Sequence, residues 1–231
     1  MNHFNWLQLI ESVGHHYIHI ATALLVTGIL FAFAFAARLQ LATAQKSNFA
    51  PADKFSIRGV AELFTEVVIN LSDMVLGPEN RRYVPLFGSI FLYVLFNNIM
   101  GMIPGMTPAT DNVNTTVAVG IFSFLTYNYF GLRAGGLTYL KHFLGPVIWL
   151  AWLMLPLEIV SHLVRPMSLG LRLMGNMQGD HTVIGIFLDL APWGVPIIFY
   201  GLGLFVSVVQ SFVFTLLSMV YLSMAVAHDE H

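Results

Sequence analysis

The longest uncharged stretch of this chain constrains its fold more than any other feature. It runs from Trp193 to Ala227 without one Asp, Glu, Lys or Arg. As a single helix, at about 1.5 Å per residue, it would measure about 50 Å, well beyond the ~30 Å of hydrocarbon in a bilayer. The whole chain shares this bias, with 57% hydrophobic and 10% charged residues. Soluble domains carry about 25% charged residues, so the sequence predicts an all-α integral membrane protein.

Composition and motifs exclude several function classes. A net charge of −2 and ten Lys and Arg residues exclude a nucleic-acid binder, which needs a dense basic face. The chain has no cysteine, which rules out disulfides, cysteine-ligated zinc and thiol catalysis. No GxxxxGK[ST] motif is present, so no nucleotide site is predicted. We expect no catalytic site, no cofactor and no metal in this chain.

Three shorter apolar runs have about the ~20 residues that an upright transmembrane helix needs. They are 20–37, 83–103 and 115–132. No basic region precedes the first run, so we expect it to remain as a membrane anchor. Eight of the ten Lys and Arg residues lie in 38–82 and 133–141, and none lies in 1–19 or 104–114. The positive-inside rule therefore places the N-terminus outside and the C-terminus in the cytoplasm.

The segment 59–78, between the first two runs, has the pattern of an amphipathic helix. Glu62, Glu66 and Asp73 fall on one helical face, and large apolar residues lie elsewhere, namely Leu63, Val67, Val68, Leu71 and Val75. This pattern predicts an interfacial helix on the cytoplasmic membrane surface. A cytosolic helix packed on a partner is the alternative.

The segments 144–190 and 193–227 are too long for upright spans and too apolar for water. Strong tilt is the simplest explanation, giving a C-terminal hairpin of two long, tilted intramembrane helices. Kinks at Pro166 and Pro196 are the alternative. With the three upright helices and the interfacial helix, the hairpin completes one membrane domain, 1–231.

Glu158, Arg165 and Arg172 follow one another at intervals of seven residues in the first of these long segments. On a helix of 3.6 residues per turn this spacing drifts only about 20° per step, so the three form a stripe. Arg172 has no acidic residue three or four positions away, although a guanidinium in a membrane helix costs about 2.5 kcal/mol or more. We expect its counter-ion on another chain. Glu158 and Arg165 can instead form a structural ion pair around Pro166.

Small and neutral polar residues surround Arg172. Gly175 and Gly179 border it and would let another helix approach closely. In a hairpin centred on Ala191, Gln210 lies roughly level with Arg172 across the helix pair and can hydrogen-bond the guanidinium without neutralising it. On the same side of the second helix, Gly203 offers space and Ser207 a hydroxyl. Asn176 lies one turn beyond Arg172, whereas His181 faces the opposite side.

Three strings carry a resemblance to a known family. They are LFNNIMGMIPGMTPATDNVNTTVAV (95–119), PMSLGLRLMGNM (166–177) and QSFVFTLLSMVYLSMA (210–225). Together they closely resemble subunit a of the F-type (F1Fo) ATP synthase, a protein of the membrane Fo sector. The resemblance covers most of the chain from about residue 60 onward.

The resemblance implies a proton-conducting stator subunit with two aqueous half-channels. Arg172 then faces the carboxylates of the c-subunit ring and couples proton flow to ring rotation and ATP synthesis. The implied partners are the c ring, the subunit b peripheral stalk, the rest of the F1Fo complex and the lipid membrane, with no nucleic acid. The implied location is the bacterial plasma (inner) membrane.

The family's other site positions map onto this chain by the same strings. Glu158 matches an acidic residue of the cytoplasmic access path, and Asn98 and Asn114 match polar residues of the outer path. Asn176 and Gln210 match the family's asparagine and glutamine. At the two positions that vary in the family this chain has His181 and Gly203, so the outer path depends on His181, with Asp180 or Asp189.

Two other functions remain as alternatives. A small secondary transporter would use Arg172 as an anion-binding charge, but it predicts internal repeats, and we see none in the sequence. A passive membrane scaffold would use the polar stripe only to pack helices.

Overall fold

The computed structural model describes residues 17–44, 56–142, 151–190 and 194–226. Within these stretches the backbone forms α-helices, short 3-10 helices and turns, with no strand. The all-α class is therefore confirmed for this part of the chain. Residues 144–150 and the turn at 191–193, both parts of the predicted hairpin, lie outside it. The chain divides into two compact units, Met1–Ala109 and Thr110–His231, and the single membrane domain stays a prediction.

The first unit holds α1, α2, the 3-10 helix η3 and α3. Their bounds are Ile18–Ala44, Ile57–Val75, Pro78–Tyr83 and Val84–Met100. Both α2 and α3 contact α1, and aromatic pairs lie between these helices. The rings of Phe33 and Phe96 are 6.2 Å apart, as are those of Phe64 and Phe91. The apolar face of α2 is thus covered in part by α3.

Local hydrogen bonds define the two ends of α2. Ser56 is the N-cap, and its hydroxyl oxygen accepts a hydrogen bond from the backbone N–H of Gly59 at 3.1 Å. After α2, Arg81 donates two hydrogen bonds to the carboxylate of Asp73, at 2.9 and 2.6 Å. This bidentate bond lowers the pKa of Asp73, because it favours the charged form.

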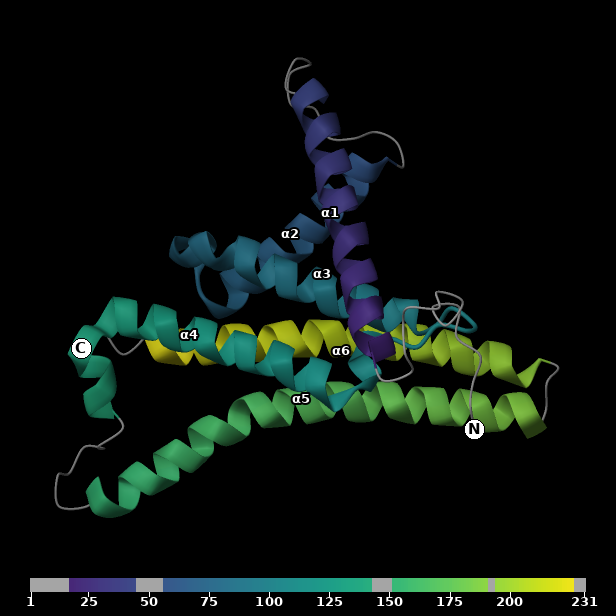
Figure 1. Ribbon diagram of the computed structural model, residues 1–231. Helices are drawn as coiled ribbons and strands as arrows, with labels where there is room; N and C mark the ends of the chain where they lie inside the picture. The colour runs from purple at the N-terminus through teal and green to yellow at the C-terminus, as the bar shows by residue number, and fades with distance from the viewer. Residues whose placement is uncertain (1–16, 45–55, 143–150, 191–193, 227–231) are drawn as a thin grey trace. The chain divides into compact units, whose positions relative to one another are not determined.

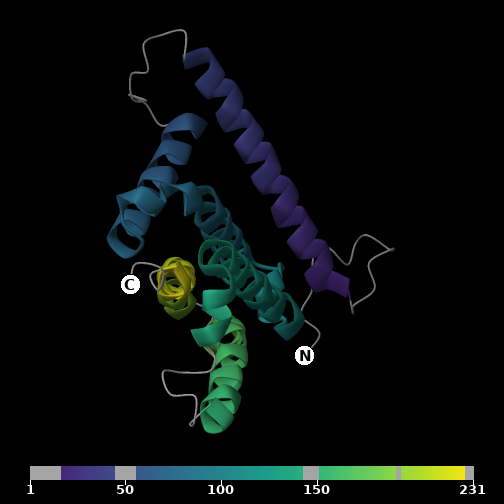
Figure 2. The ribbon, with the colours of Figure 1, turned by 90° about the vertical axis from the view of Figure 1, so that its left-hand side faces the viewer.

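The second unit is a bundle of three long helices. They are α4 (Val113–His142), α5 (Ala151–Leu190) and α6 (Val195–Val226), and each contacts the other two. Figures 1 and 2 show them side by side, with α5 and α6 as the two arms of a hairpin. The 3-10 helix η4 (Ala109–Asp111) leads into α4. Gly136, at φ 53°, interrupts the regular backbone of α4.

Prolines affect α5 and α6 differently. Pro156 and Pro166 lie inside α5, which is one element of 40 residues and bends in its first half (Figure 1). Pro196 lies in the first turn of α6, where the missing N–H would have no helical partner. It therefore does not divide the second arm.

The backbones of α4 and α5 meet at two glycines. A Cβ atom on Gly120 would lie 2.5 Å from the carbonyl oxygen of Pro166. One on Gly170 would lie 2.9 Å from the Cα atom of Val117. Small residues permit such an approach between membrane helices.

Three described helices are long and apolar enough to cross a membrane. They cover Ile18–Ala42, Pro78–Met100 and Val195–Val226. The predicted upright span 115–132 is not among them, because Thr, Ser and Asn side chains interrupt its apolar residues. Its crossing of the membrane, like that of α5, stays a prediction.

Candidate functional site

Arg172 lies on an open face of α5. Its side chain is exposed, and it forms no hydrogen bond or ion pair with any residue that the structure describes. Gly175 and Gly179 are also exposed, and a Cβ atom on either would meet nothing within 4 Å. We call these three residues the arginine face. It offers a fixed positive charge beside bare backbone.

Gln210 contacts Asn176 and not Arg172. The amide nitrogen of Asn176 donates a hydrogen bond to Oε1 of Gln210 at 2.6 Å, and Gln210 is 4% exposed. The expectation that Gln210 lies level with Arg172 is therefore wrong by about one turn. The reason is the position of the turn. Because α5 ends at Leu190 and α6 begins at Val195, the midpoint between the two helices comes later in the chain than Ala191, where the prediction assumed it.

The two small residues predicted near Gln210 are buried on α6. Gly203 and Ser207 both face the inside of the second unit. The carbonyl oxygen of Ser207 accepts a hydrogen bond from the Ser211 hydroxyl at 2.7 Å. The Ser211 hydroxyl thereby pairs its donor within its own helix, as a membrane interior requires.

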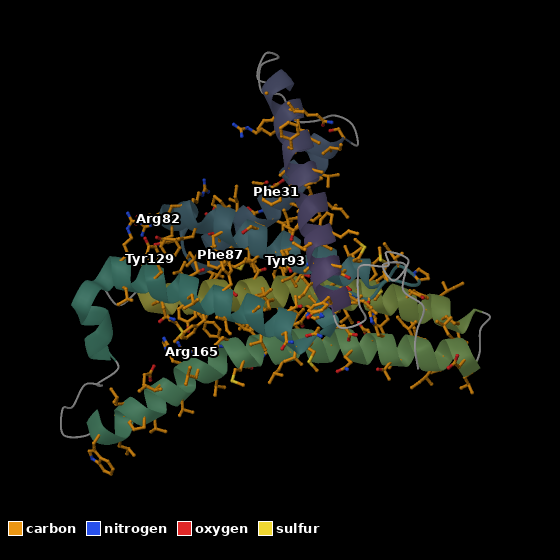
Figure 3. The ribbon with its side chains drawn as sticks, in the orientation of Figure 1. Phe31, Arg82, Phe87, Tyr93, Tyr129 and Arg165 are labelled. Carbon is orange, nitrogen blue, oxygen red and sulfur yellow. The ribbon has the colours of Figure 1, made fainter. Side chains whose placement is uncertain are left out.

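Arg165 has partners within its own chain. Its Nη2 atom lies 4.0 Å from Oε1 of Glu158, and its guanidinium carbon lies 5.5 Å from the ring centre of Tyr221. Figure 3 shows Arg165 pointing from α5 toward the other helices of the bundle. The structural ion pair predicted for Glu158 and Arg165 is thus present.

A second polar cluster, the outer cluster, consists of Asp111, Asp180 and His181. Each has one buried polar atom without a hydrogen-bond partner among the described residues: Oδ1, Oδ2 and Nε2, respectively. Burial raises the pKa of Asp111, and the nearby charge of His181 opposes that shift. Because buried polar atoms in proteins are bonded to protein or water, this cluster is suited to hold water.

Asp111 was not predicted as a site residue. The available signal was its place in the 104–114 loop, three residues before Asn114, inside one of the strings that carry the family resemblance. Nothing in the sequence shows that this loop meets the α5 turn holding Asp180 and His181, 69 residues further along.

Asn114 and Asp189 are not joined to this cluster by any hydrogen bond or ion pair among the described residues, and Asn98 belongs to the other compact unit. Asn98 is buried in α3, in the first unit. Asn114 is exposed at the start of α4, where its backbone N–H donates to Oδ1 of Asn112 at 2.9 Å. Asp189 is exposed one residue before the end of α5.

Along α5 the predicted residues lie at three levels. Arg172 is fourteen residues after Glu158, about 21 Å along a helix, and nine residues before His181, about 14 Å. The unpaired charge therefore stands between two groups of titratable side chains. In the described part of the chain no three His, Asp or Glu side chains gather in a way that could hold a metal ion.

Comparison with known proteins identifies the family of this chain. A family model described as ATP synthase A chain matches residues 20–223. The chain belongs to this family. ATP synthase subunit a of Bdellovibrio bacteriovorus is 56% identical over 227 residues, which cover 98% of this chain and 99% of that protein. Subunit a 1 of Syntrophotalea carbinolica is 38% identical over 96% of this chain and 92% of that protein. Subunit a of Nitratidesulfovibrio vulgaris is 46% identical over 74% of this chain and 76% of that protein.

Membership of the ATP synthase A chain family fixes the coarse function. The chain is a proton-translocating membrane subunit of the Fo sector of an F-type ATP synthase. The match covers almost all of α1 to α6, and so it includes the arginine face, the Glu158–Arg165 pair and the outer cluster.

Proposed function

We propose that this chain is the stator subunit that presents Arg172 to the ring of c subunits. It couples proton flow across the membrane to ring rotation and ATP synthesis. The observation that carries this proposal is the exposed guanidinium of Arg172, which has no partner among the described residues. Such a charge in a membrane helix needs an acid, and a passing c-ring carboxylate supplies one.

The chemistry follows from the fixed charge. An opposite charge within ~4–6 Å lowers the pKa of a carboxyl group by about 1–3 units. Arg172 therefore favours the ionised ring carboxylate as it passes and repels a proton that would leak straight through. Arginine is suited to this role because it does not lose its own proton.

Two aqueous half-channels lead to that position from opposite sides. The inner half-channel contains Glu158 and opens to the cytoplasm. The outer half-channel contains the outer cluster and the other polar residues predicted for it. These are Asn98, Asn114 and Asp189. Ser207, on the same side of α6 as Gln210, is a further residue of the proton path. The neutral Asn176–Gln210 pair lies beside Arg172 and adds no charge that would compete with it.

The c ring and the subunit b stalk are the partners we propose within the F1Fo complex. The chain lies in the bacterial inner membrane with its N-terminus outside, because Lys and Arg gather on the segments assigned to the cytoplasm.

The test replaces Arg172 in the assembled complex. We expect Arg172→Ala and Arg172→Lys to reduce ATP-driven proton pumping by inverted membrane vesicles to background, because lysine lacks the planar fork and can deprotonate when buried. Immunoblots should show normal amounts of the subunit. Arg133→Ala, at another exposed arginine of the second unit, is the matched control and should pump normally. Normal pumping by Arg172→Ala would refute the proposal.

A further inference from the structure

His162 is a buried titratable residue that the proposed function does not use. It lies on α5, is 9% exposed, and its Nε2 atom is 3.0 Å from Oδ1 of Asn128 on α4. The rings of Phe124 and Tyr127 meet its ring edge to face, with centroids 5.5 and 5.8 Å away. The side chain of His162 is thus held from α4 by a hydrogen bond and by two aromatic rings.

The hydrogen bonds of Asn128 determine which nitrogen of His162 carries a proton. Asn128 donates from Nδ2 to the carbonyl oxygen of Phe124 at 2.8 Å. A carbonyl oxygen only accepts, so the amide nitrogen must face Phe124 and the amide oxygen must face His162. Oδ1 is an acceptor as well, and therefore Nε2 of His162 is the donor.

His162 also sits between the two members of the inner ion pair. It is one turn after Glu158 and one turn before Arg165 on α5. A chain of contacts through α6 and α4 also links Arg165 to His162. Arg165 lies over the ring of Tyr221, whose centroid is 5.9 Å from that of Tyr127, and the Tyr127 ring packs against His162. All three helices of the second unit thus contribute to the placement of Glu158.

The backbone of α5 is weakened at the same turn. Proline has no N–H, so Pro166 cannot make the helical hydrogen bond to the carbonyl of residue 162. A helix lacking that bond can change its bend, and the bend sets the direction of the arm that carries Glu158. The bond from His162 to Asn128 ties this weakened turn to α4.

We infer that His162 is a positioning residue of the inner half-channel. Its hydrogen bond to Asn128 fixes the turn of α5 that presents Glu158 and Arg165. The inference rests on the proposed function, because it gives Glu158 its place on the inner path. His162 does not relay the translocated proton in this scheme.

The experiment measures passive proton flux through Fo in vesicles from which F1 has been stripped. His162→Phe keeps the aromatic packing but has no donor, and it should lower the flux about fivefold, the effect of one lost hydrogen bond. His162→Gln keeps a donor and should restore most of the flux. Asn128→Leu should match His162→Phe, and the double variant should be no worse, because both remove the same bond.

Glu158→Gln separates positioning from general damage. In that background His162→Phe should cause no further loss of flux, whereas a purely structural defect would add to it. His19→Phe, on α1, is the control histidine and should leave flux unchanged. If His162→Phe does not accumulate in the membrane, Asn128→Leu and His162→Gln decide the question.

Two results would overturn the inference: unchanged flux in both His162→Phe and Asn128→Leu, or additive losses in the double variant. Either can occur while Glu158→Gln still lowers flux, and then only the inference fails. If Glu158→Gln itself conducts normally, the inner path of the proposed function fails first.

Discussion

Two arginines seven residues apart on α5 have opposite surroundings. Arg165 has an acid and an aromatic ring within its own chain, whereas Arg172 has neither among the described residues. A side chain satisfied internally stabilises the bundle, and one left exposed is available to another chain. The function of each arginine thus follows from its partners and not from its residue type.

The outer cluster gives a prediction about pH. Burial raises the pKa of Asp111, and the positive charge of His181 opposes this by favouring the carboxylate. Removing that charge in His181→Ala should therefore raise the pKa of Asp111 further, so that the carboxyl stays protonated to higher pH. Infrared spectra of the carboxyl C=O band across a pH titration would measure the shift.

Asp111→Asn identifies the band in that experiment, because it removes this carboxyl alone. An Asp111 band that titrates at lower pH in His181→Ala than in the parent protein would contradict the electrostatic interaction between them.

Sequence reasoning at this scale identified Arg172 and its lack of a local acid, because helical spacing is visible in the chain. It misplaced Gln210, since the register of a hairpin depends on where its turn lies. It missed Asp111 and Asn128, whose importance comes from contacts with residues distant in the chain.

Helix ends show a second limit of sequence reasoning. The predicted run 115–132 ends at the first charge, but α4 continues to His142. Hydropathy marks where apolar residues stop, whereas a helix continues while its backbone hydrogen bonds do. The break inside α4 is at Gly136, whose positive φ is open to glycine without strain.

The contact between α4 and α5 gives a prediction about stability. Gly170→Leu should force the backbones apart, since even a Cβ atom there would lie 2.9 Å from the Cα of Val117. We expect a cost of about 1–3 kcal/mol or more, typical of overpacking. The thermal midpoint of the detergent-solubilised complex would show the loss. Gly201→Leu, at an exposed glycine of α6 where a Cβ atom would meet nothing within 4 Å, should leave it unchanged; equal stability of the two variants would refute this account.

For the molecule as a whole, the residues assigned to the outer path come from both compact units. Asn98 belongs to the first, and Asp111, Asp180 and His181 belong to the second.

Membrane orientation can be tested cleanly because the chain has no cysteine, so that an introduced thiol is unique. Ile103→Cys and Glu79→Cys place one thiol at each end of the second apolar run. An impermeant maleimide should label the first in intact cells and the second only in inverted vesicles. The reverse pattern would invert the proposed topology.

The partner of the arginine face can be tested in the same way. Gly175→Cys and Gly179→Cys should form disulfides with cysteines placed on the lipid-buried helix of a c subunit. Leu173→Cys is the matched control, because that side chain is fully buried on another face of α5. Crosslinks from position 173 alone would place the ring elsewhere.

The exposed glycines beside Arg172 also affect how easily a neighbouring chain can slide past this face in the proposed function. A surface of bare backbone has no rotamers to rearrange when a neighbour slides across it, so every arriving subunit encounters the same contour. Interdigitating side chains would instead have to disengage at each step. In the proposed function, the attraction between Arg172 and a passing acid is released when that acid is neutralised, and the glycines add no interlocking side chains to the contact.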